Sequence, residues 1–149
     1  MNFSDKTIAA VIAIVNVFET GRALGAFSSI AVLDDGAGVS YGIGQFTHRS
    51  GSLAEVVERF LNKSGSGPLT GYLPLLKKRT RAAIEKLAAD AAFKNELREA
   101  ADSHEMRAAQ REVLFERYLA PAIGVCDERN FRLPLSLAVV FDSLVHGSF

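Results

Sequence analysis

Two carboxylates, Glu19 and Asp35, have types and surroundings that could do chemistry in this chain. Glu19 follows an apolar run, so partial burial would raise the pKa of its carboxyl group, as a general acid requires. Asp35 lies in a glycine-bounded turn, where an ionised carboxylate could take a proton from a water molecule. An acid at a helix end that faces an acid in a hairpin turn could form a two-carboxylate hydrolytic site.

Each of these residues also has an ordinary structural interpretation. Glu19 could be a solvated residue at a helix end, although that position disfavours a carboxylate by roughly 0.3–1 kcal/mol. Asp35 could hydrogen-bond its own backbone, and the neighbouring Asp34 competes for either role. Arg22 could bind a sugar hydroxyl, pair with Glu19 or lie on the surface. The residues alone leave these alternatives open.

The elements that must position the two carboxylates are a helix and a β-hairpin. Ser4 is a good N-cap, apolar residues then recur at helical spacing, and Gly21 suits a left-handed C-terminal position. Because alanines and valines fill the remaining positions, we expect this helix to be buried on most sides. Residues 26–33 and 39–46 are typical of two antiparallel strands, joined by a turn rich in Asp and Gly.

The rest of the chain is predicted to be helical. The sequence 52–55, Ser-Leu-Ala-Glu, fits a capping box that opens a helix, and a flexible loop follows at 63–68. Pro121 is expected to end one later helix and Pro134 to open the last. Helices are expected at four further places: 73–78, 82–101, 103–119 and 135–145. The predicted fold class is α+β, mainly α, with a small antiparallel hairpin near the start of one domain over 1–149.

Bulk composition argues against several classes of protein. The 149 residues are 48% hydrophobic and 23% charged, which is typical of a globular domain. Seventeen basic and 17 acidic residues give a net charge of +0, so neither nucleic acid nor a membrane is an expected partner. No window reaches the ~20 apolar residues of a membrane span. We interpret the apolar run 8–18 as a mature helix and expect no signal peptide, because Asp5 flanks it and no cleavage pattern follows.

Neither a cofactor nor a metal ion is expected. The single cysteine, Cys126, is expected to be a small buried hydrophobe. The pair Gly42 and Gly44 is only a weak phosphate-binding signal, because no Lys or Ser/Thr pattern completes it. Three histidines lack the spacing of metal ligands: His48, His104 and His146.

Two further patterns have both a functional and a structural interpretation. Asp142 and His146 are one helical turn apart, so their side chains could meet as a structural pair or serve a site. The basic run 77–81 is the only one in the chain, and such a run is usually a solvated surface.

The segment 35–46, D-G-A-G-V-S-Y-G-I-G-Q-F, resembles the catalytic hairpin of the chitosanases of glycoside hydrolase family 46. In that family a Glu at the end of the first long helix corresponds to Glu19. The sequences F-E-T-G-R and S-Y-G-I-G-Q also resemble chitosanase-like domains of bacterial and phage proteins thought to act on cell walls. Further pieces agree in order along the chain: Ser50-Gly51, Tyr72-Leu73-Pro74, Ala109-Gln110, Pro121-Ala122 and Asp142 with Val145-His146-Gly147.

The resemblance implies a lysozyme-like fold and an inverting endo-hydrolase of a β-1,4-linked amino-sugar polymer. By carry-over, Glu19 is the general acid, Asp35 is the general base, and Ser40 helps to hold the attacking water where the family usually has Thr. Inverting enzymes hold their two carboxyl groups about 6.5–9.5 Å apart to admit this water. The substrate-binding residues expected from the resemblance are Arg22, Tyr41, Gln45, Asp142 and His146.

Departures from the family pattern bear on the substrate. Ser52 stands where chitosan-active members usually have a further Asp, and Ala37 stands where some have Arg. The expected polymer is therefore either chitosan or an N-acetylated, peptidoglycan-type glycan. Either substrate implies action in the periplasm or outside the cell.

Members of the family continue well past the segment 142–147, so the C-terminal part of the family fold is expected to be missing here. A second copy of the chain could complete the cleft as a homo-oligomer. The alternative function is a non-catalytic glycan- or partner-binding remnant. A plain helical interaction domain would have no pocket between Glu19 and Asp35.

Overall fold

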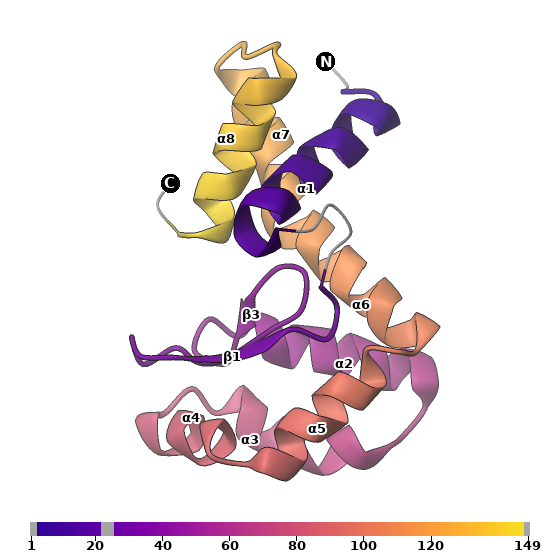
Figure 1. Ribbon diagram of the computed structural model, residues 1–149, viewed down its shortest axis with the longest axis vertical. Coiled ribbons are helices and arrows are strands. Elements are labelled where there is room, and N and C mark those ends of the chain that lie inside the picture. The colour runs from indigo at the N-terminus through magenta and orange to yellow at the C-terminus, as the bar shows by residue number, and fades with distance from the viewer. Residues whose placement is uncertain (1–2, 22–25, 148–149) are drawn as a thin grey trace. The chain divides into compact units, whose positions relative to one another are not determined.

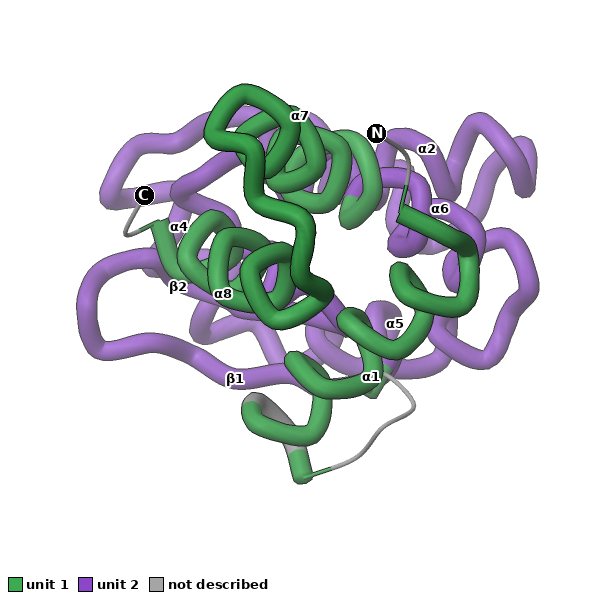
Figure 2. The backbone as a smooth tube through the Cα atoms, turned by 90° about the horizontal axis from the view of Figure 1, so that it is seen from above, with its two compact units in different colours: residues 1–26, 114–149 green, residues 27–113 purple. Residues whose placement is uncertain are grey.

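The structure, a computed structural model, describes residues 3–21 and 26–147, without the side chains of residues 19 and 20 (Figure 1). It is mostly helical with one small antiparallel sheet, which confirms the predicted fold class. The chain divides into two compact units, coloured separately in Figure 2. Unit 1 comprises residues 1–26 and 114–149, and unit 2 comprises residues 27–113.

Unit 1 is built from helices. α8 (Pro134–Val145) packs against both α1 (Asp5–Thr20) and α7 (Ala120–Glu128), which follows a π-helical turn at Phe115–Leu119 (Figure 1). The predicted ends of the first helix are confirmed, because the Thr7 N–H donates to Ser4 Oγ at 3.2 Å and Gly21 closes the helix with φ 71°. The buried side chains of the unit include Val11, Val15, Leu119, Cys126, Leu137 and Phe141.

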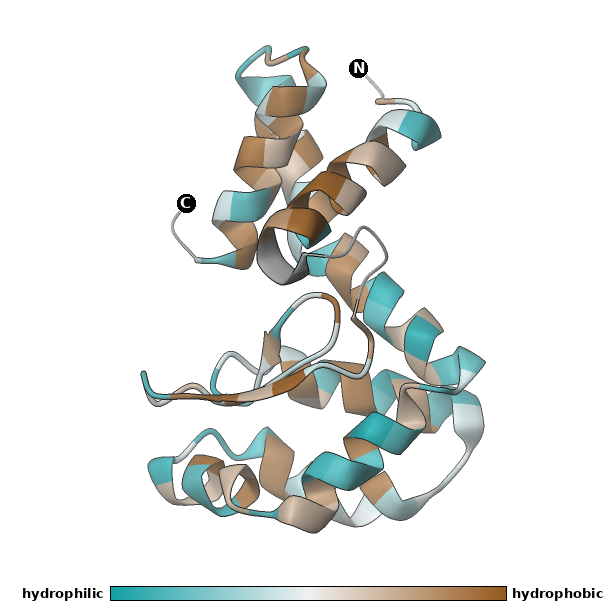
Figure 3. Ribbon diagram, viewed as in Figure 1, coloured by the Kyte–Doolittle hydropathy of each residue, from teal (hydrophilic) through white to brown (hydrophobic). Residues whose placement is uncertain are grey.

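The prediction that the first helix is buried on most sides is wrong. Phe18 is 83% exposed, and Ile14 and Val17, which share its face of α1, are each 46% exposed. α8 has a second exposed apolar stripe at Leu135 and Val139. Figure 3 shows the brown, hydrophobic positions along both helices. Composition overestimated burial because it counts apolar residues and does not reveal which surfaces are covered.

Unit 2 contains the sheet, whose order is β1 (Ile30–Leu33), β2 (Gly38–Tyr41) and β3 (Phe46–Thr47). The predicted antiparallel hairpin is confirmed, and its register pairs Ala31 with Ser40. The predicted second strand, 39–46, is in fact two strands. Between them Gly42 at φ 75° and Gln45 at φ 46° turn the chain, so a strand cannot continue.

Six helical segments complete unit 2, and two of them cover the sheet. α4 (Arg81–Ala88) packs on β2, and α2 (Ser52–Ser64) packs on β3. Gly38 in β2 has φ 78°, and a Cβ there would lie 2.6 Å from Ile84 Cγ2 of α4, so only glycine fits. The remaining segments are the 3₁₀ turn Pro68–Tyr72, α3 (Leu73–Lys77), α5 (Ala91–Ala100) and α6 (His104–Leu114).

The capping box predicted at 52–55 is wrong. Gly51 is the N-cap of α2, while Ser52 Oγ accepts a hydrogen bond from the Thr47 N–H at 3.0 Å and lies 2.7 Å from Ser50 Oγ. Ser52 is fully buried and therefore links β3 to α2. Its hydroxyl is thus engaged with Thr47 and Ser50 inside the protein.

Two predicted helix ends are also wrong. The helix expected over 82–101 is split into α4 and α5, because Asp90 Oδ1 accepts a hydrogen bond from the Phe93 N–H at 2.9 Å and caps a new helix. Pro121 does not end the helix over 103–119. It occupies the first turn of α7, directly after the π-helical turn 115–119, and the helical path continues.

Tyr41 makes the stability of unit 2 sensitive to alkaline pH. Its ring is fully buried and its hydroxyl donates to the Leu97 carbonyl at 2.7 Å, and burial raises the pKa of this hydroxyl far above the ordinary 10.0. Above pH 10 the unfolded chain loses this proton while the folded chain keeps it. The free energy of unfolding should therefore fall as pH rises, by up to about 1.4 kcal/mol per pH unit.

Urea unfolding of the wild type and Tyr41→Phe between pH 9 and pH 11 measures this slope. The variant should be less stable at pH 9, because the Leu97 carbonyl loses its donor. Above pH 10, the free energy of unfolding of the variant should fall less steeply with pH than that of the wild type. Equal slopes for the two proteins would show that Tyr41 is not the responsible group.

Candidate active site

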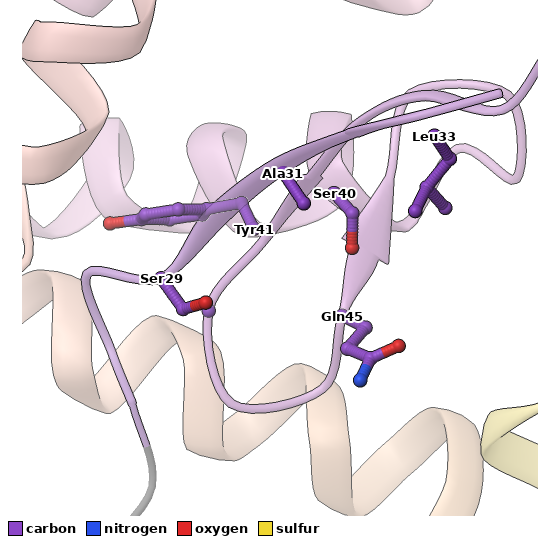
Figure 4. A pocket seen from close by; sticks show the side chains of 7 residues that line it. Ser29, Ala31, Leu33, Ser40, Tyr41 and Gln45 are labelled. Atoms are coloured by element: carbon purple, nitrogen blue, oxygen red, sulfur yellow. The ribbon is translucent and has the colours of Figure 1, made fainter. Parts of the chain in front are cut away.

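A pocket of about 150 Å³ lies on one face of the β1–β2 ribbon, entirely within unit 2 (Figure 4). Strand side chains alternate between faces, so Ser29, Ala31 and Leu33 share this face, and the register adds Ser40 opposite Ala31. The residues that line the pocket are Ser29, Ala31, Leu33, Ser40, Tyr41, Gly42 and Gln45. The structure therefore brings together three residues of the predicted site: Ser40, Tyr41 and Gln45.

The loop that forms one end of this pocket is held by Gln110 of α6. The Ile43 N–H donates to Gln110 Oε1 at 3.1 Å, and Gln110 Nε2 donates to the Phe27 carbonyl at 2.9 Å. Gln110 is fully buried, so both ends of its amide are used inside the protein. The sequence analysis gave Gln110 no role, because its two partners are 67 and 83 residues away along the chain.

Tyr41 borders the pocket but directs its hydroxyl elsewhere. In Figure 4 its ring points away from the Ser40 hydroxyl, and its hydroxyl is hydrogen-bonded to the Leu97 carbonyl. Ser40 itself is only 6% exposed, and Gln45 holds its side chain at the pocket from a left-handed backbone. Such a backbone in a residue other than glycine is more common at functional sites than elsewhere.

Asp35 lies in the turn that follows Leu33. The Ala37 N–H donates to Asp35 Oδ1 at 2.9 Å, which is the ordinary turn interaction that the sequence analysis left open. The carboxylate remains 62% exposed, so this interaction leaves it accessible to water. Asp35 therefore combines a fixed turn conformation with an exposed carboxylate.

Arg49 is a residue near Asp35 that the sequence analysis missed. Its Nη1 donates to the Asp35 carbonyl at 2.8 Å, and its Nη2 lies 4.0 Å from Asp35 Oδ2. Its backbone N–H also donates to the Ala37 carbonyl at 3.1 Å. Arg49 thus fixes the turn from the chain segment beyond β3. No local pattern signals this contact, because it depends on how the ribbon folds back.

The other predicted site residues belong to unit 1. Glu19 lies in the last turn of α1, but its side chain and the whole of Arg22 lie outside the described residues. Asp142 Oδ1 and His146 Nε2 are 3.6 Å apart, so the predicted pair forms. Because Glu19 and Asp35 are in different units, their facing one another stays a prediction.

Two further findings concern the described residues as a whole. Within 3–21 and 26–147, no group of three or more His, Cys, Asp or Glu side chains is arranged to hold a metal ion. None of the helices in these ranges is long and apolar enough to cross a membrane.

Several solved structures with the same fold are chitosanases. The native chitosanase of Bacillus subtilis MY002 matches with a TM-score of 0.90 and 25% identity, covering 99% of this chain and 61% of its own. A mutant of that enzyme in complex with six GlcN units matches with a TM-score of 0.89 and 24% identity over the same shares. The GH46 chitosanase of Gynuella sunshinyii in complex with chitotetraose matches with a TM-score of 0.90 and 22% identity, again covering 99% and 61%.

Sequence comparison gives the same family. The chitosanase of Bacillus subtilis strain 168 is 29% identical over 135 residues, which cover 90% of this chain and 49% of that enzyme. The chain thus spans about half the length of this curated relative. The family model described as glycosyl hydrolase family 46 matches residues 13–148. This chain therefore belongs to glycosyl hydrolase family 46.

Proposed function

We propose that this chain is a glycosidase that hydrolyses a β-1,4-linked amino-sugar polymer within the chain, with inversion at the anomeric carbon. The polymer is chitosan or a peptidoglycan-type glycan. The observation that supports this most directly is the pocket beside the Asp35 turn, lined by Ser40 and Gln45, in a chain that matches the family over residues 13–148.

In this proposal two carboxyl groups act on opposite sides of the scissile bond. Glu19 protonates the leaving oxygen, and Asp35 takes a proton from the water that attacks the anomeric carbon. Ser40, whose hydroxyl borders the pocket, helps to hold that water. The ionised Asp35 also stabilises the positive charge that develops on the sugar ring. Arg49 contributes by fixing the turn that carries Asp35.

The predicted sugar ligands belong to both units. Gln45 offers an amide at the pocket, and Asp142 and His146 are each nearly half exposed, so they are accessible to a polymer. Tyr41 has its hydroxyl bound to Leu97, so any contact with the sugar would come from its other atoms. Arg22 remains a predicted sugar ligand.

A reducing-end assay on chitosan and on purified peptidoglycan, run side by side, tests the proposal. We expect new reducing ends from at least one polymer, and NMR of the first products should show the inverted, α anomer. Retention of configuration would contradict the inverting mechanism. The absence of new ends from both polymers would contradict the hydrolase assignment.

A specific observation favours the alternative function, a non-catalytic glycan- or partner-binding remnant. Leu133, Leu135 and Val139 at the start of α8 are 66%, 70% and 58% exposed, and Phe18 of α1 is more exposed still. Apolar surface of this kind often marks a contact with another polypeptide. A second copy of this chain that completes the cleft is one form of that contact. Glycan binding without turnover would support this alternative.

A further inference from the structure

We infer that Gln110 of α6 is a positioning residue for the glycan, which acts through Ser29 and Gln45 in the lining of the ribbon pocket. This inference rests on the proposed function, because it names a residue that sets how tightly the same pocket holds a sugar. The Gln110 side chain is fully buried, so it does not itself touch the polymer. Its effect is on affinity rather than on the chemical step.

The two hydrogen bonds of the Gln110 amide end at equivalent points of the pocket lining. Its Nε2 donates to the Phe27 carbonyl at 2.9 Å, two residues before Ser29. Its Oε1 accepts from the Ile43 N–H at 3.1 Å, two residues before Gln45. Two segments of the lining are therefore bonded to one planar amide, and a shift of this amide moves both of them.

Backbone hydrogen bonds carry this connection into the pocket. The Gly42 N–H donates to the Ser29 carbonyl at 2.9 Å, and the Gln45 N–H donates to the Gly42 carbonyl at 3.3 Å. Ile43 lies inside this short turn, so a displacement of its N–H changes the backbone of Gln45, whose φ of 46° leaves little freedom. Figure 4 shows the Ser29 and Gln45 side chains beside the loop that these bonds close.

The surroundings of Gln110 hold its amide in place. Arg107 and Arg111 share its face of α6, and their guanidinium groups lie 5.2 and 4.9 Å from the ring centroid of Phe27, within cation–π distance. Phe27 is therefore attached to α6 by its ring as well as by its carbonyl. At the other end, a Cβ on Gly42 would overlap Gln110 Oε1, so the amide packs directly against the loop backbone.

Gln110→Met tests the inference, because it keeps the length of the side chain and removes both hydrogen bonds. We expect KM for the polymer that the wild type cleaves to rise roughly five- to tenfold, as for one lost hydrogen bond to the sugar, with kcat changed by less than about twofold. Loss of folded protein alone would lower the apparent kcat and leave KM unchanged. An unchanged KM in the folded variant would overturn the inference.

Ser103→Ala is the matched control. Ser103 Oγ donates to the Ala100 carbonyl at 2.7 Å and accepts from the Met106 N–H at 3.2 Å, so this change also removes two hydrogen bonds of one side chain at α6. Ser103 is outside the pocket lining. The control should lower the stability of unit 2 and leave KM unchanged. An equal rise of KM in both variants would contradict a role for the pocket.

A double mutant tests the route through Gln45. Gln45→Asn shortens the side chain and keeps a residue that tolerates a left-handed backbone. Combined with Gln110→Met, it should raise KM by less than the product of the two single fold-changes, because both act on the same contact. A rise equal to the product would contradict this route.

Phe27→Leu is a second variant that keeps the test open if Gln110→Met does not fold. It retains the backbone carbonyl but removes the ring beside Arg107 and Arg111, which loosens the same attachment. KM should rise roughly two- to fivefold, as for one lost cation–π contact. An unchanged KM would again overturn the inference.

Binding separates this inference from the proposed function. In Glu19→Gln, the dissociation constant of a GlcN or GlcNAc hexamer, whichever binds, should rise by the same factor when Gln110→Met is added. If the wild type cleaves no polymer but this rise occurs, the hydrolase assignment fails and the positioning role stands. If cleavage occurs but neither KM nor the dissociation constant changes, the positioning role fails alone. The absence of both cleavage and binding would overturn both.

Discussion

Glu19→Gln and Asp35→Asn should each lower the rate of polymer hydrolysis by about a thousandfold or more while the fold is kept. General acid and general base catalysis typically contribute 10²- to 10⁴-fold each, and an amide can neither give nor take the required proton. The rate of reducing-end formation measures the loss. Circular dichroism and the midpoint of urea unfolding verify that each variant is folded.

Two carboxylates on the same elements serve as controls. Asp5→Asn removes an acid from the first turn of α1, and Asp34→Asn removes the acid next to Asp35 in the same turn. Both variants should retain most of the activity. Full activity in Glu19→Gln or Asp35→Asn would refute the two-carboxylate mechanism, and loss of activity in Asp34→Asn alone would move the role of the base to Asp34.

Gly42→Ala should destabilise unit 2 by roughly 3–6 kcal/mol. A Cβ at this position would overlap Oε1 of Gln110 and lie 2.7 Å from its Cδ, so the amide that binds Ile43 and Phe27 would have to move. The estimate combines about 1–2 kcal/mol for a left-handed alanine, 1–3 for overpacking and about 1 for a lost hydrogen bond. Urea unfolding followed by circular dichroism measures the change.

Gly124→Ala provides the matched control for that substitution. Gly124 lies in α7 without a left-handed backbone, and nothing lies within 4 Å of the added Cβ, so its replacement should be neutral or slightly stabilising. Combining Gly42→Ala with Gln110→Ala should cost less than the sum of the two changes, because the overlap is then gone. Simple additivity would show that the overlap is not the cause.

Local signals predicted much of the fold. Ser4 and Gly21 bound α1 as expected, because an N-cap and a left-handed C-terminal residue act within one helical turn. Pro134 opens α8 as predicted, because the effect of a proline in the first turn of a helix is also local. The sequence analysis missed the break at Asp90 and the continuation through Pro121. Asp90 could lie within one helix or cap a second, and Pro121 could end a helix or lie in the first turn of the next. In both cases the tertiary structure decides.

The candidate site was predictable only in part. Ser40 and Gln45 line one pocket because the chain turns between Gly42 and Gln45, whereas the predicted continuous strand 39–46 would have placed their side chains on opposite faces. Gln110 and Arg49 have their effect through contacts that form only after the chain folds back, so no periodicity reveals them. The pairing of Glu19 with Asp35 depends on two separately compact units and stays a prediction.

The reactivity of the single cysteine can measure how often unit 1 unfolds locally. Cys126 is fully buried between α7 and its neighbours, and burial raises the pKa of its thiol. A thiol reagent can therefore react only during excursions that expose this helix, and the labelling rate counts those excursions. The ultraviolet absorption of a deprotonated Tyr41 would report the corresponding events in unit 2. One chain thus contains two intrinsic reporters, which can show whether its halves unfold together or one at a time.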